Sequence, residues 1–182
     1  ADGNDGAAGP QGPQGPAGPT GGYPVHTIGE SYGGGIVFYV YDGGQHGLIS
    51  SQAQMQVRWH AGTDGNTFAR AEKLNAGKAN TAIIISASIA IGNDGGQFAA
   101  RYCNEYYTTM NGIIYGDWYL PSKHELNLLY AQRSVVNISW GQYWSSTEHN
   151  STNAWLLNFG TGVNASGDKD FNTIKAHPIR AF

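Results

Sequence analysis

In the segment GDWYLPSKHELNLLYAQR (residues 116–133), the order of residue types predicts where a helix begins. Ser122 can accept a hydrogen bond from a free backbone N–H of the first turn. Glu125, three positions later, can accept one from the backbone of Ser122, which completes a capping box. The apolar residues that follow recur at helical spacing, and the buried stripe is expected to consist of Leu126, Leu129 and Tyr130. We therefore expect a helix that starts after Ser122 and packs one face against a core.

Downstream of this helix the pattern becomes typical of strands. GQYWSSTE (Gly141 to Glu148) and NAWLLNFGTG (Asn153 to Gly162) are rich in aromatic and aliphatic residues and flank the polar stretch HNST. They predict an antiparallel pair. The polar residues from Val163 to Thr173 predict a loop, and the closing HPIRAF (residues 177–182) predicts a terminal strand.

Upstream, the first globular segment predicts a β-hairpin. IVFYVYD (Ile36 to Asp42) is β-branched and aromatic, Asp42-Gly43-Gly44 supplies a turn, and His46 to Ile49 supplies the returning strand. The glycines from Gly33 to Gly35 precede this strand and lack the Lys-Ser/Thr ending of a phosphate loop. We expect them to mark a close approach of two backbones.

The middle of the chain is less decisive. Phe68 to Asn75 predicts a short helix, with Gly77 near its end. Ile83 to Ile91 is apolar and could be a strand or a buried helix, because periodicity alone does not separate them. Gln97 to Met110 has helical spacing and is expected to end at Asn111-Gly112. The single Cys103 lies on the apolar side of this segment, so it is expected to be a buried thiol and makes no intrachain disulfide.

These elements predict an α+β fold. The order of strands and helices shows no repeated βαβ rhythm, which an α/β fold would require. Residues 23–182 have the length of one ordinary domain, so we expect a single globular domain with small antiparallel sheets and two to three helices.

Residues 1–22 have a different character. Glycine occupies every third position from Gly3 to Gly21, and four prolines each follow one of these glycines. This period is typical of collagen, where three polyproline-II chains share an axis on which only glycine fits. A flexible linker has no reason to keep the period. The segment predicts a collagen-like triple helix, and therefore a homotrimer.

Charge and hydropathy exclude some classes of protein. The chain has 10 Lys and Arg against 13 Asp and Glu, with a formal net charge of −3. A dedicated nucleic-acid-binding protein is strongly basic, so we expect no nucleic-acid partner. No apolar run reaches the about 20 residues that cross a bilayer, so we expect no membrane insertion.

Several motifs together resemble one known family. DWYLPSKHELNLLY, YWSSTE, AWLLNF and the closing IRAF, with GGGIVFYVYDGGQHGLIS and GKANT upstream, are similar to the domain of unknown function found at the C-terminus of the Legionella collagen-like adhesin. The wider family is similar to C-type-lectin-like folds, in which N- and C-terminal strands pair and two helices flank small sheets. The resemblance implies an extracellular adhesin on the bacterial surface that trimerises and recognises sulfated host glycosaminoglycans of the heparin or chondroitin sulfate type. It implies no residue-level binding motif.

Binding a sulfated polysaccharide requires Lys and Arg side chains spread over a shallow surface. Each cation could equally be an ordinary solvated surface charge, but three copies around one axis would present every weak site three times to one polyanion. One candidate cluster consists of Arg70, Lys73 and Lys78. The other consists of Lys169, Lys175 and Arg180, with Lys123 and Arg133 flanking the helix after Pro121. Asp168 and Asp170 lie beside Lys169 and weaken that loop as an anion-binding site. The predicted binding residues are therefore Arg70, Lys73, Lys78, Lys123, Arg133, Lys175 and Arg180.

Metal chemistry has weak support in the sequence. The loop NASGDKD (Asn164 to Asp170) could hold calcium or be a solvated turn, and it lacks the EF-hand spacing. The Glu-Pro-Asn and Gln-Pro-Asp tripeptides expected of calcium-dependent C-type lectins do not occur. We expect no metal and no cofactor.

Catalytic chemistry is also weakly supported. Cys103 has six histidines as possible partners but no activating context. Ser145-Ser146-Thr147 lacks a G-x-S-x-G context. Glu125 and Glu148 could be paired carboxylates, but Glu125 is expected to cap a helix. We expect no enzymatic activity, and we expect Trp118, Trp140, Trp144 and Trp155 in the core, not on a sugar-stacking surface.

Two functions follow from these observations. The first is the head of a trimeric adhesin that binds sulfated glycosaminoglycans through many electrostatic contacts. The alternative is a structural domain that nucleates and registers the collagen-like stalk. The VFYVY strand (residues 37–41) is a candidate for the trimer interface.

Overall fold

The capping box predicted at Ser122 is confirmed. The computed structural model describes residues 24–182, and the triple helix predicted for residues 1–22 lies outside them. Helix α3 spans Lys123–Ala131. The Ser122 hydroxyl accepts a hydrogen bond from the Glu125 N–H at 3.2 Å, and the Glu125 carboxylate accepts one from the Ser122 N–H at 2.7 Å. Leu126 and Leu129 are buried, so the helix packs its apolar face inward.

A four-stranded antiparallel sheet joins the two ends of the described chain. Its order is β1-β2-β3-β11, and its strands are Ser31–Tyr32, Gly35–Tyr41, His46–Ser50 and Ile179–Ala181. The predicted hairpin and terminal strand are both confirmed. Gly35, the first residue of β2, marks the predicted close approach of two backbones, because a Cβ there would lie 2.1 Å from the Ser50 carbonyl oxygen. The strands from both ends of the chain share one sheet, as the resemblance implied.

The second sheet has five strands in the order β4-β10-β7-β8-β9. These strands are Met55–Gln56, Lys175–Ala176, Gln142–Glu148, Asn153–Asn158 and Val163–Asp168. All pair antiparallel except β10 with β7, which is parallel. The predicted pair β7 and β8 is confirmed. The loop predicted from Val163 was wrong over its first half, because all of β9 pairs with β8. Although the residues of β9 are polar and have low strand propensity, they form a strand because they pair with β8 at the edge of the sheet.

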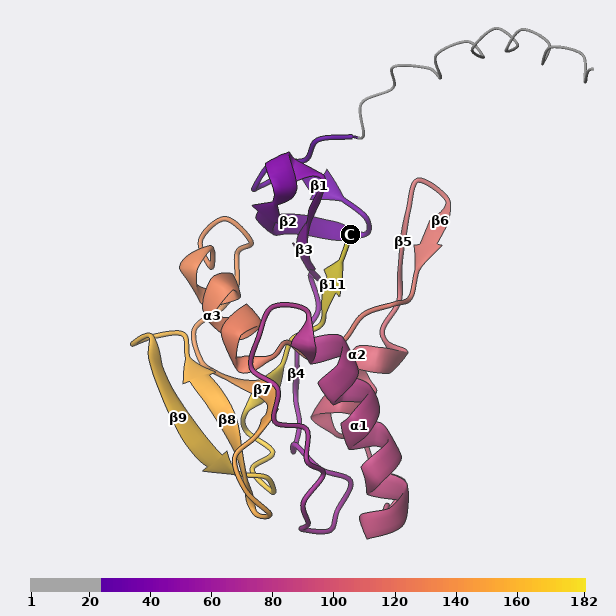
Figure 1. Cartoon of the computed structure of the whole chain (residues 1–182), viewed down its shortest axis with the longest axis vertical. Coiled ribbons are helices and arrows are strands. Elements are labelled where there is room, and N and C mark those ends of the chain that lie inside the picture. The colour runs from indigo at the N-terminus through magenta and orange to yellow at the C-terminus, as the bar shows by residue number, and fades with distance from the viewer. Residues whose placement is uncertain (1–23) are drawn as a thin grey trace, which may run out of the picture.

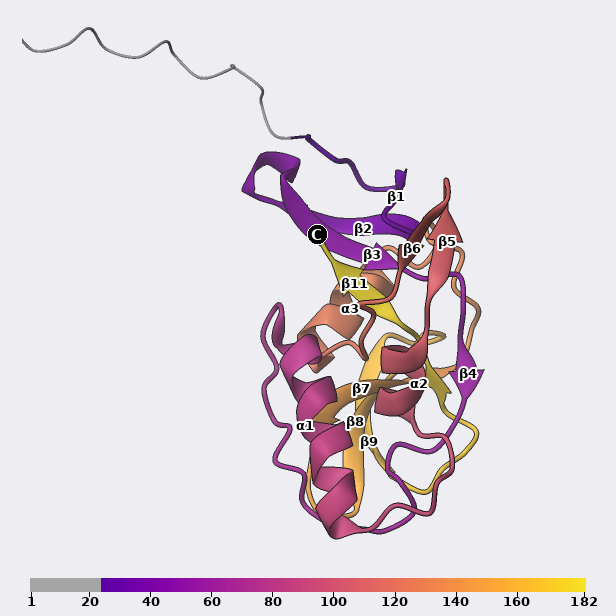
Figure 2. The same ribbon diagram turned by 90° about the vertical axis from the view of Figure 1, so that its right-hand side faces the viewer.

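Helices α1 (Ala76–Ile91) and α2 (Ala99–Glu105) cover one side of this sheet (Figures 1 and 2). The open choice for Ile83 to Ile91 is resolved as helix. The helix predicted from Phe68 to Asn75 was wrong: both of these residues have positive φ, and the segment between them is irregular. Gly77 lies in the first turn of α1, where a Cβ would lie 2.4 Å from Glu125 Oε2.

The segment predicted as one helix from Gln97 to Met110 splits into two elements. Helix α2 ends at Glu105, and β5 (Thr108–Met110) then pairs with β6 (Ile113–Tyr115). Asn111 and Gly112 have φ angles of 53° and 78°. Two successive positive φ values form the tight turn that suits the twist of a β-hairpin, so Asn111-Gly112 turns a hairpin and does not end a helix.

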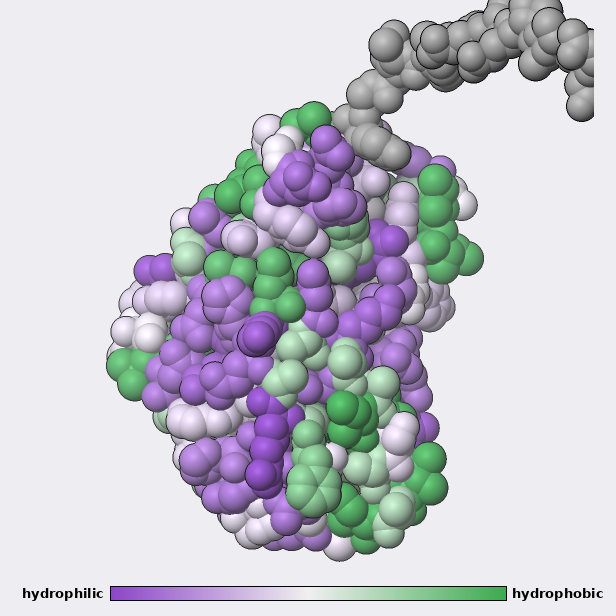
Figure 3. Space-filling view, viewed as in Figure 1, coloured by the Kyte–Doolittle hydropathy of each residue, from purple (hydrophilic) through white to green (hydrophobic). Residues whose placement is uncertain are grey.

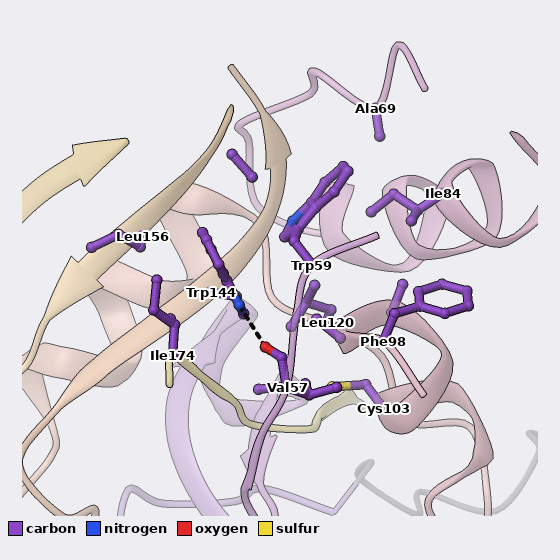
Figure 4. Packing of buried hydrophobic residues seen from close by; sticks show 14 of the residues in the cluster. Val57, Trp59, Ala69, Ile84, Phe98, Cys103, Leu120, Trp144, Leu156 and Ile174 are labelled. Carbon is purple, nitrogen blue, oxygen red and sulfur yellow. Dashed lines mark hydrogen bonds between the residues drawn. The ribbon is translucent and has the colours of Figure 1, made fainter. Parts of the chain in front are cut away.

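The main core lies between the five-stranded sheet and helices α1 and α2 (Figure 4). Trp144 Nε1 donates to the Val57 carbonyl at 2.9 Å, so the indole is both buried and hydrogen-bonded. Cys103 is fully buried in this core as predicted, and burial raises the pKa of its thiol well above the usual value. Trp118 and Trp144 are buried as predicted. Trp140 was predicted wrongly, because 82% of it is exposed.

Residues 24–182 therefore form one α+β domain with three α-helices and small sheets, which confirms the predicted fold class. The four-stranded sheet lies at the end where residue 24 enters, and the five-stranded sheet with α1 and α2 forms the other end (Figure 1). Across residues 24–182, none of the helices is both long enough and apolar enough to cross a bilayer.

His177 predicts how acid affects this fold. Its side chain is buried, its Nε2 lies 2.8 Å from Ser50 Oγ, and burial lowers its pKa to about 3. The unfolded chain has the ordinary pKa and binds a proton first as pH falls, so folding stability decreases as pH falls below about 6.5. The expected contribution is a loss of about 2 kcal/mol between pH 7 and pH 5.

Urea unfolding at several pH values measures this loss. The His177→Gln variant should lack this part of the pH dependence, whereas the exposed His124→Gln should keep it. Equal pH dependence in wild type and His177→Gln would contradict the assignment to His177.

Candidate functional site

An open groove lies between the irregular segment 66–75 and the first turns of α3. Its volume is about 410 Å³. The groove is lined by Glu72, Lys73, Leu74, Lys123, His124 and Asn127. Two of the predicted binding residues, Lys73 and Lys123, therefore meet at one site although 50 positions separate them in the sequence.

The first half of the irregular segment is fixed by Glu148 at the end of β7. Its carboxylate accepts hydrogen bonds from the backbone N–H groups of Thr67 at 2.7 Å and Phe68 at 2.9 Å. The Glu148 N–H donates in turn to the Ala69 carbonyl at 2.7 Å. These bonds hold the backbone in place without a helix.

The second half is fixed by the cap of α3. The Glu125 carboxylate accepts from the N–H groups of Asn75 at 2.8 Å and Gly77 at 3.1 Å, in addition to that of Ser122. The Ser122 hydroxyl lies 3.0 Å from the Lys73 carbonyl oxygen, and the His124 N–H donates to the Glu72 carbonyl at 3.2 Å. The wall that carries Lys73 is thus hydrogen-bonded directly to the helix that carries Lys123.

Lys123 is held between a carboxylate and an aromatic ring. Its Nζ lies 3.4 Å from Glu72 Oε1 and 3.7 Å from the centre of the Trp155 ring. Trp155 is half-buried on β8, and a cation over the indole face is attracted by the ring quadrupole. Lys73 is exposed, and within residues 24–182 no ion pair joins it to a carboxylate. Its charge is available to an anion from solvent.

Arg70 lies on the same segment, but its charge is partly engaged. Its Nε is 3.6 Å from Glu148 Oε2, and its guanidinium donates to the Asn66 side chain at 3.1 Å. Its side chain is 51% exposed to solvent. Arg70 and Lys73 do not share a helical face, because the helix predicted there does not form.

The other predicted cations lie apart from the groove. Lys78 is exposed on α1, and Arg133 follows α3 with its guanidinium 4.2 Å from the centre of the Tyr130 ring. Lys175 on β10 donates to Ser139 Oγ at 2.7 Å, and Arg180 on β11 pairs with Asp117. Lys175 and Arg180 belong to different sheets, so the predicted C-terminal cluster was wrong.

Lys169, which belonged to that cluster but was left out of the predicted binding residues, has a completely buried side chain. Its Nζ lies 2.9 Å from Glu148 Oε1 and donates to the Gly65 and Ser151 carbonyls, each at 2.8 Å. The three ammonium protons therefore have three acceptors. Glu148 is the partner of a lysine and Glu125 caps α3, so the two carboxylates do not form a catalytic pair, as the expected capping role of Glu125 indicated.

Electrostatics in this buried pair follow from its hydrogen bonds. Burial lowers the pKa of the Lys169 ammonium, although Glu148 opposes that shift. Burial alone would raise the pKa of Glu148, but the Thr67 N–H and Lys169 outweigh it and hold that pKa below the usual value.

The sequence contains one signal for the buried position of Lys169. If Val163 to Asp168 is assigned as a strand, alternation places Gly167 and Lys169 on the same buried face.

The suggested calcium loop has a different role in the structure. Asp168 ends β9, and Asp170 Oδ1 lies 3.0 Å from His60 Nε2. His60 Nδ1 accepts a hydrogen bond from the Gly62 N–H at 2.7 Å, so in the neutral ring Nε2 carries the proton and faces Asp170. Within the described part of the chain, no three His, Cys, Asp or Glu side chains form a cluster suited to a metal ion.

The Ser145-Ser146-Thr147 run considered for catalysis lies behind the groove wall, where the Thr147 hydroxyl accepts a hydrogen bond from the Lys123 N–H at 3.0 Å. Ser145, Ser146 and Thr147 are all buried. The Ser145 hydroxyl donates to the Trp155 carbonyl at 2.9 Å, and the Thr147 hydroxyl donates to the Ala71 carbonyl at 3.1 Å. These hydroxyls stabilise the fold around the groove wall.

Comparison of the sequence with known proteins identifies no family for this chain. No protein-family model matches the sequence, and no curated protein matches it. Among solved structures, the chain is similar to a fimbrial protein from Bacteroides ovatus, with 19% identity and a TM-score of 0.46. The alignment covers 75% of this chain and 35% of the fimbrial protein, so this chain corresponds to about a third of that structure.

Proposed function

We propose that residues 24–182 form the head of a trimeric, extracellular bacterial adhesin that binds sulfated glycosaminoglycans without a metal, a cofactor or a chemical reaction. The observation that carries the proposal is the convergence of Lys73 and Lys123 on one open groove. Sulfate groups carry permanent negative charge and accept charge-assisted hydrogen bonds from ammonium groups. The Trp155 ring lies beneath Lys123 and holds that ammonium beside the groove, while the Asn127 amide is already hydrogen-bonded to Asn164, so the two lysines are the groups that an anion would meet.

The weak net charge of the chain is compatible with this function. One groove with two lysines and the neighbouring Glu72 would bind a sulfated chain weakly. Three grooves around one axis would contact the same polymer together, and such avidity raises apparent affinity by roughly 10²–10⁴. The collagen-like period of residues 3–21 is the feature of the sequence that calls for three copies.

The test is binding of a defined heparin oligosaccharide to the full chain. Lys73→Ala combined with Lys123→Ala should weaken binding by about tenfold or more, because two cations are lost from each site. The matched control is Arg133→Ala with Lys175→Ala, which removes the same charge elsewhere. Wild-type binding should also fall steeply with added salt, since the Debye length shrinks from about 30 Å at 0.01 M to about 3 Å at 1 M.

Equal losses in the two double variants would mean that overall charge, and not the groove, governs binding. Unchanged binding in both, or binding insensitive to salt, would contradict the proposal. The second candidate function, registration of a collagen-like stalk, would then be favoured. It is supported by the exposed apolar surface of α1 and the β5–β6 hairpin, which a single chain leaves uncovered.

A further inference from the structure

The outward side of α1 is apolar although it faces solvent in the single chain. In the helix sequence AGKANTAIIISASIAI, Lys78 is the one charged residue. Ile83 is 41% exposed and Ile89 is 76% exposed. Figure 3 shows a green area over α1 at the lower right of the molecule. A surface helix of a soluble protein normally has a polar outer face, and a contiguous apolar patch marks a contact surface.

A second apolar surface is the projecting β5–β6 hairpin. Residues 107–115 contain no charged side chain. Tyr107, Ile113 and Ile114 are 68%, 56% and 69% exposed. A two-stranded hairpin is marginally stable in water, so packing against another surface would stabilise it. The hairpin stands out from the body on the same side as α1, and Figure 3 shows it green at the upper right.

We propose that this side of the molecule, formed by α1 and the β5–β6 hairpin, packs against two further copies of this chain around a three-fold axis. The inference rests on the trimer in the proposed function and adds the surface that forms it. The earlier candidate, the VFYVY strand, lies within β2, which pairs with β3 along one edge and with β1 only at Gly35 and Ile36. None of its residues is fully exposed, so it offers less apolar surface to a partner than α1 or the hairpin.

The collagen-like segment identifies the occupant as a second copy. Its glycine period requires three chains on one axis, and it joins the described chain at Pro24, at the end of the molecule near the hairpin. Three heads that hang from one axis lie side by side, so one long side of each must face the others. The apolar side fits that position, because interfaces between permanent partners are more hydrophobic than other protein surface.

The same arrangement leaves the groove open. Helix α3, which carries Lys123, lies on the left in Figure 1, whereas α1 and the hairpin lie on the right. An anionic lipid surface is a poorer occupant of the apolar side, because membrane-binding helices carry several Lys or Arg residues along the polar face and α1 has Lys78 alone.

The experiment measures the mass of the full chain by light scattering over a range of concentrations. Wild type should have the mass of three chains. Ile89→Asp on α1 and Ile114→Asp on the hairpin should each raise the concentration of half-dissociation by about 30-fold or more. Val163→Asp is the matched control, because Val163 is 59% exposed at the start of β9 on the far side of the molecule. It should leave the trimer unchanged.

A wild-type trimer that neither aspartate variant weakens would overturn the assigned interface and leave glycan binding through the groove intact. A wild-type single chain at micromolar concentration would overturn the inference and the trimer together, and another protein would then be the partner of this surface. If one variant loses its circular dichroism spectrum, the other decides, because the two side chains lie on separate elements. The heparin assay on the groove variants reports independently on the proposed function.

Discussion

Replacing Lys169 by methionine is expected to lower the free energy of unfolding by about 3–5 kcal/mol. Lys169 and Glu148 are both completely buried and 2.9 Å apart. The Lys169→Met variant leaves the Glu148 carboxylate without its buried counter-charge, and the Gly65 and Ser151 carbonyls lose their donor. An unpaired buried charge costs far more than the net gain from forming the pair.

Urea or guanidinium unfolding of the full chain measures this effect. The control is Lys78→Met, because Lys78 is exposed on α1 and surface substitutions change stability by about 0.5 kcal/mol or less. Adding Glu148→Gln to Lys169→Met removes the stranded charge and should recover part of the loss. A Lys169→Met variant as stable as the control would show that the pair does not form.

Replacing Glu125 by glutamine is expected to cost about 3 kcal/mol or more, although the two side chains have nearly the same shape. The Glu125 carboxylate is fully buried and accepts from the N–H groups of Asn75, Gly77 and Ser122, while the Tyr119 hydroxyl lies 3.3 Å away. A glutamine replaces one acceptor oxygen with an NH2 donor, so at least one buried N–H faces another donor. Leaving a buried donor without a partner costs about 1–3 kcal/mol, and more for a charged partner.

Thermal or chemical unfolding tests this value, with Glu105→Gln as the control. Glu105 pairs with Arg101 on the surface of α2, where removal of the charge should cost less than about 1 kcal/mol. Because Glu125 also fixes the wall that carries Lys73, its replacement should weaken heparin binding in protein that remains folded. Stability losses of similar size in the two variants would mean that the buried acceptor has no special role.

Local patterns in the sequence were sufficient for several elements of this fold. The capping box of α3, the β2–β3 hairpin and the β7–β8 pair each depend on residues close together in the chain, so their patterns are complete within a short window. The errors occurred where distant partners decide. Phe68 to Asn75 was predicted as a helix, but this segment is fixed by Glu125 and Glu148, which lie far along the chain. Strand β9 is polar and forms because β8 lies beside it.

At the candidate site, too, local patterns were sufficient for some features, while distant partners decided others. Lys73 and Lys123 were both predicted as binding residues, because exposed cations can be expected from composition alone. Their meeting at one groove depends on the bonds from Ser122 and His124 to the segment that carries Lys73, which no short window contains. Lys169 was misplaced for a related reason. A lysine is expected at the surface unless its buried partner is known, and Glu148 is on another strand.

The first and last strands of the described residues share the four-stranded sheet, and this has a practical consequence. Phe182 exchanges backbone hydrogen bonds with Gly47, and it lines the same hollow as Pro24. A dye, tag or tether joined after Phe182 would therefore emerge at the end from which the collagen-like segment leaves. Protein attached to a sensor chip through that point would direct the opposite end outward, in the orientation that the proposed stalk would impose.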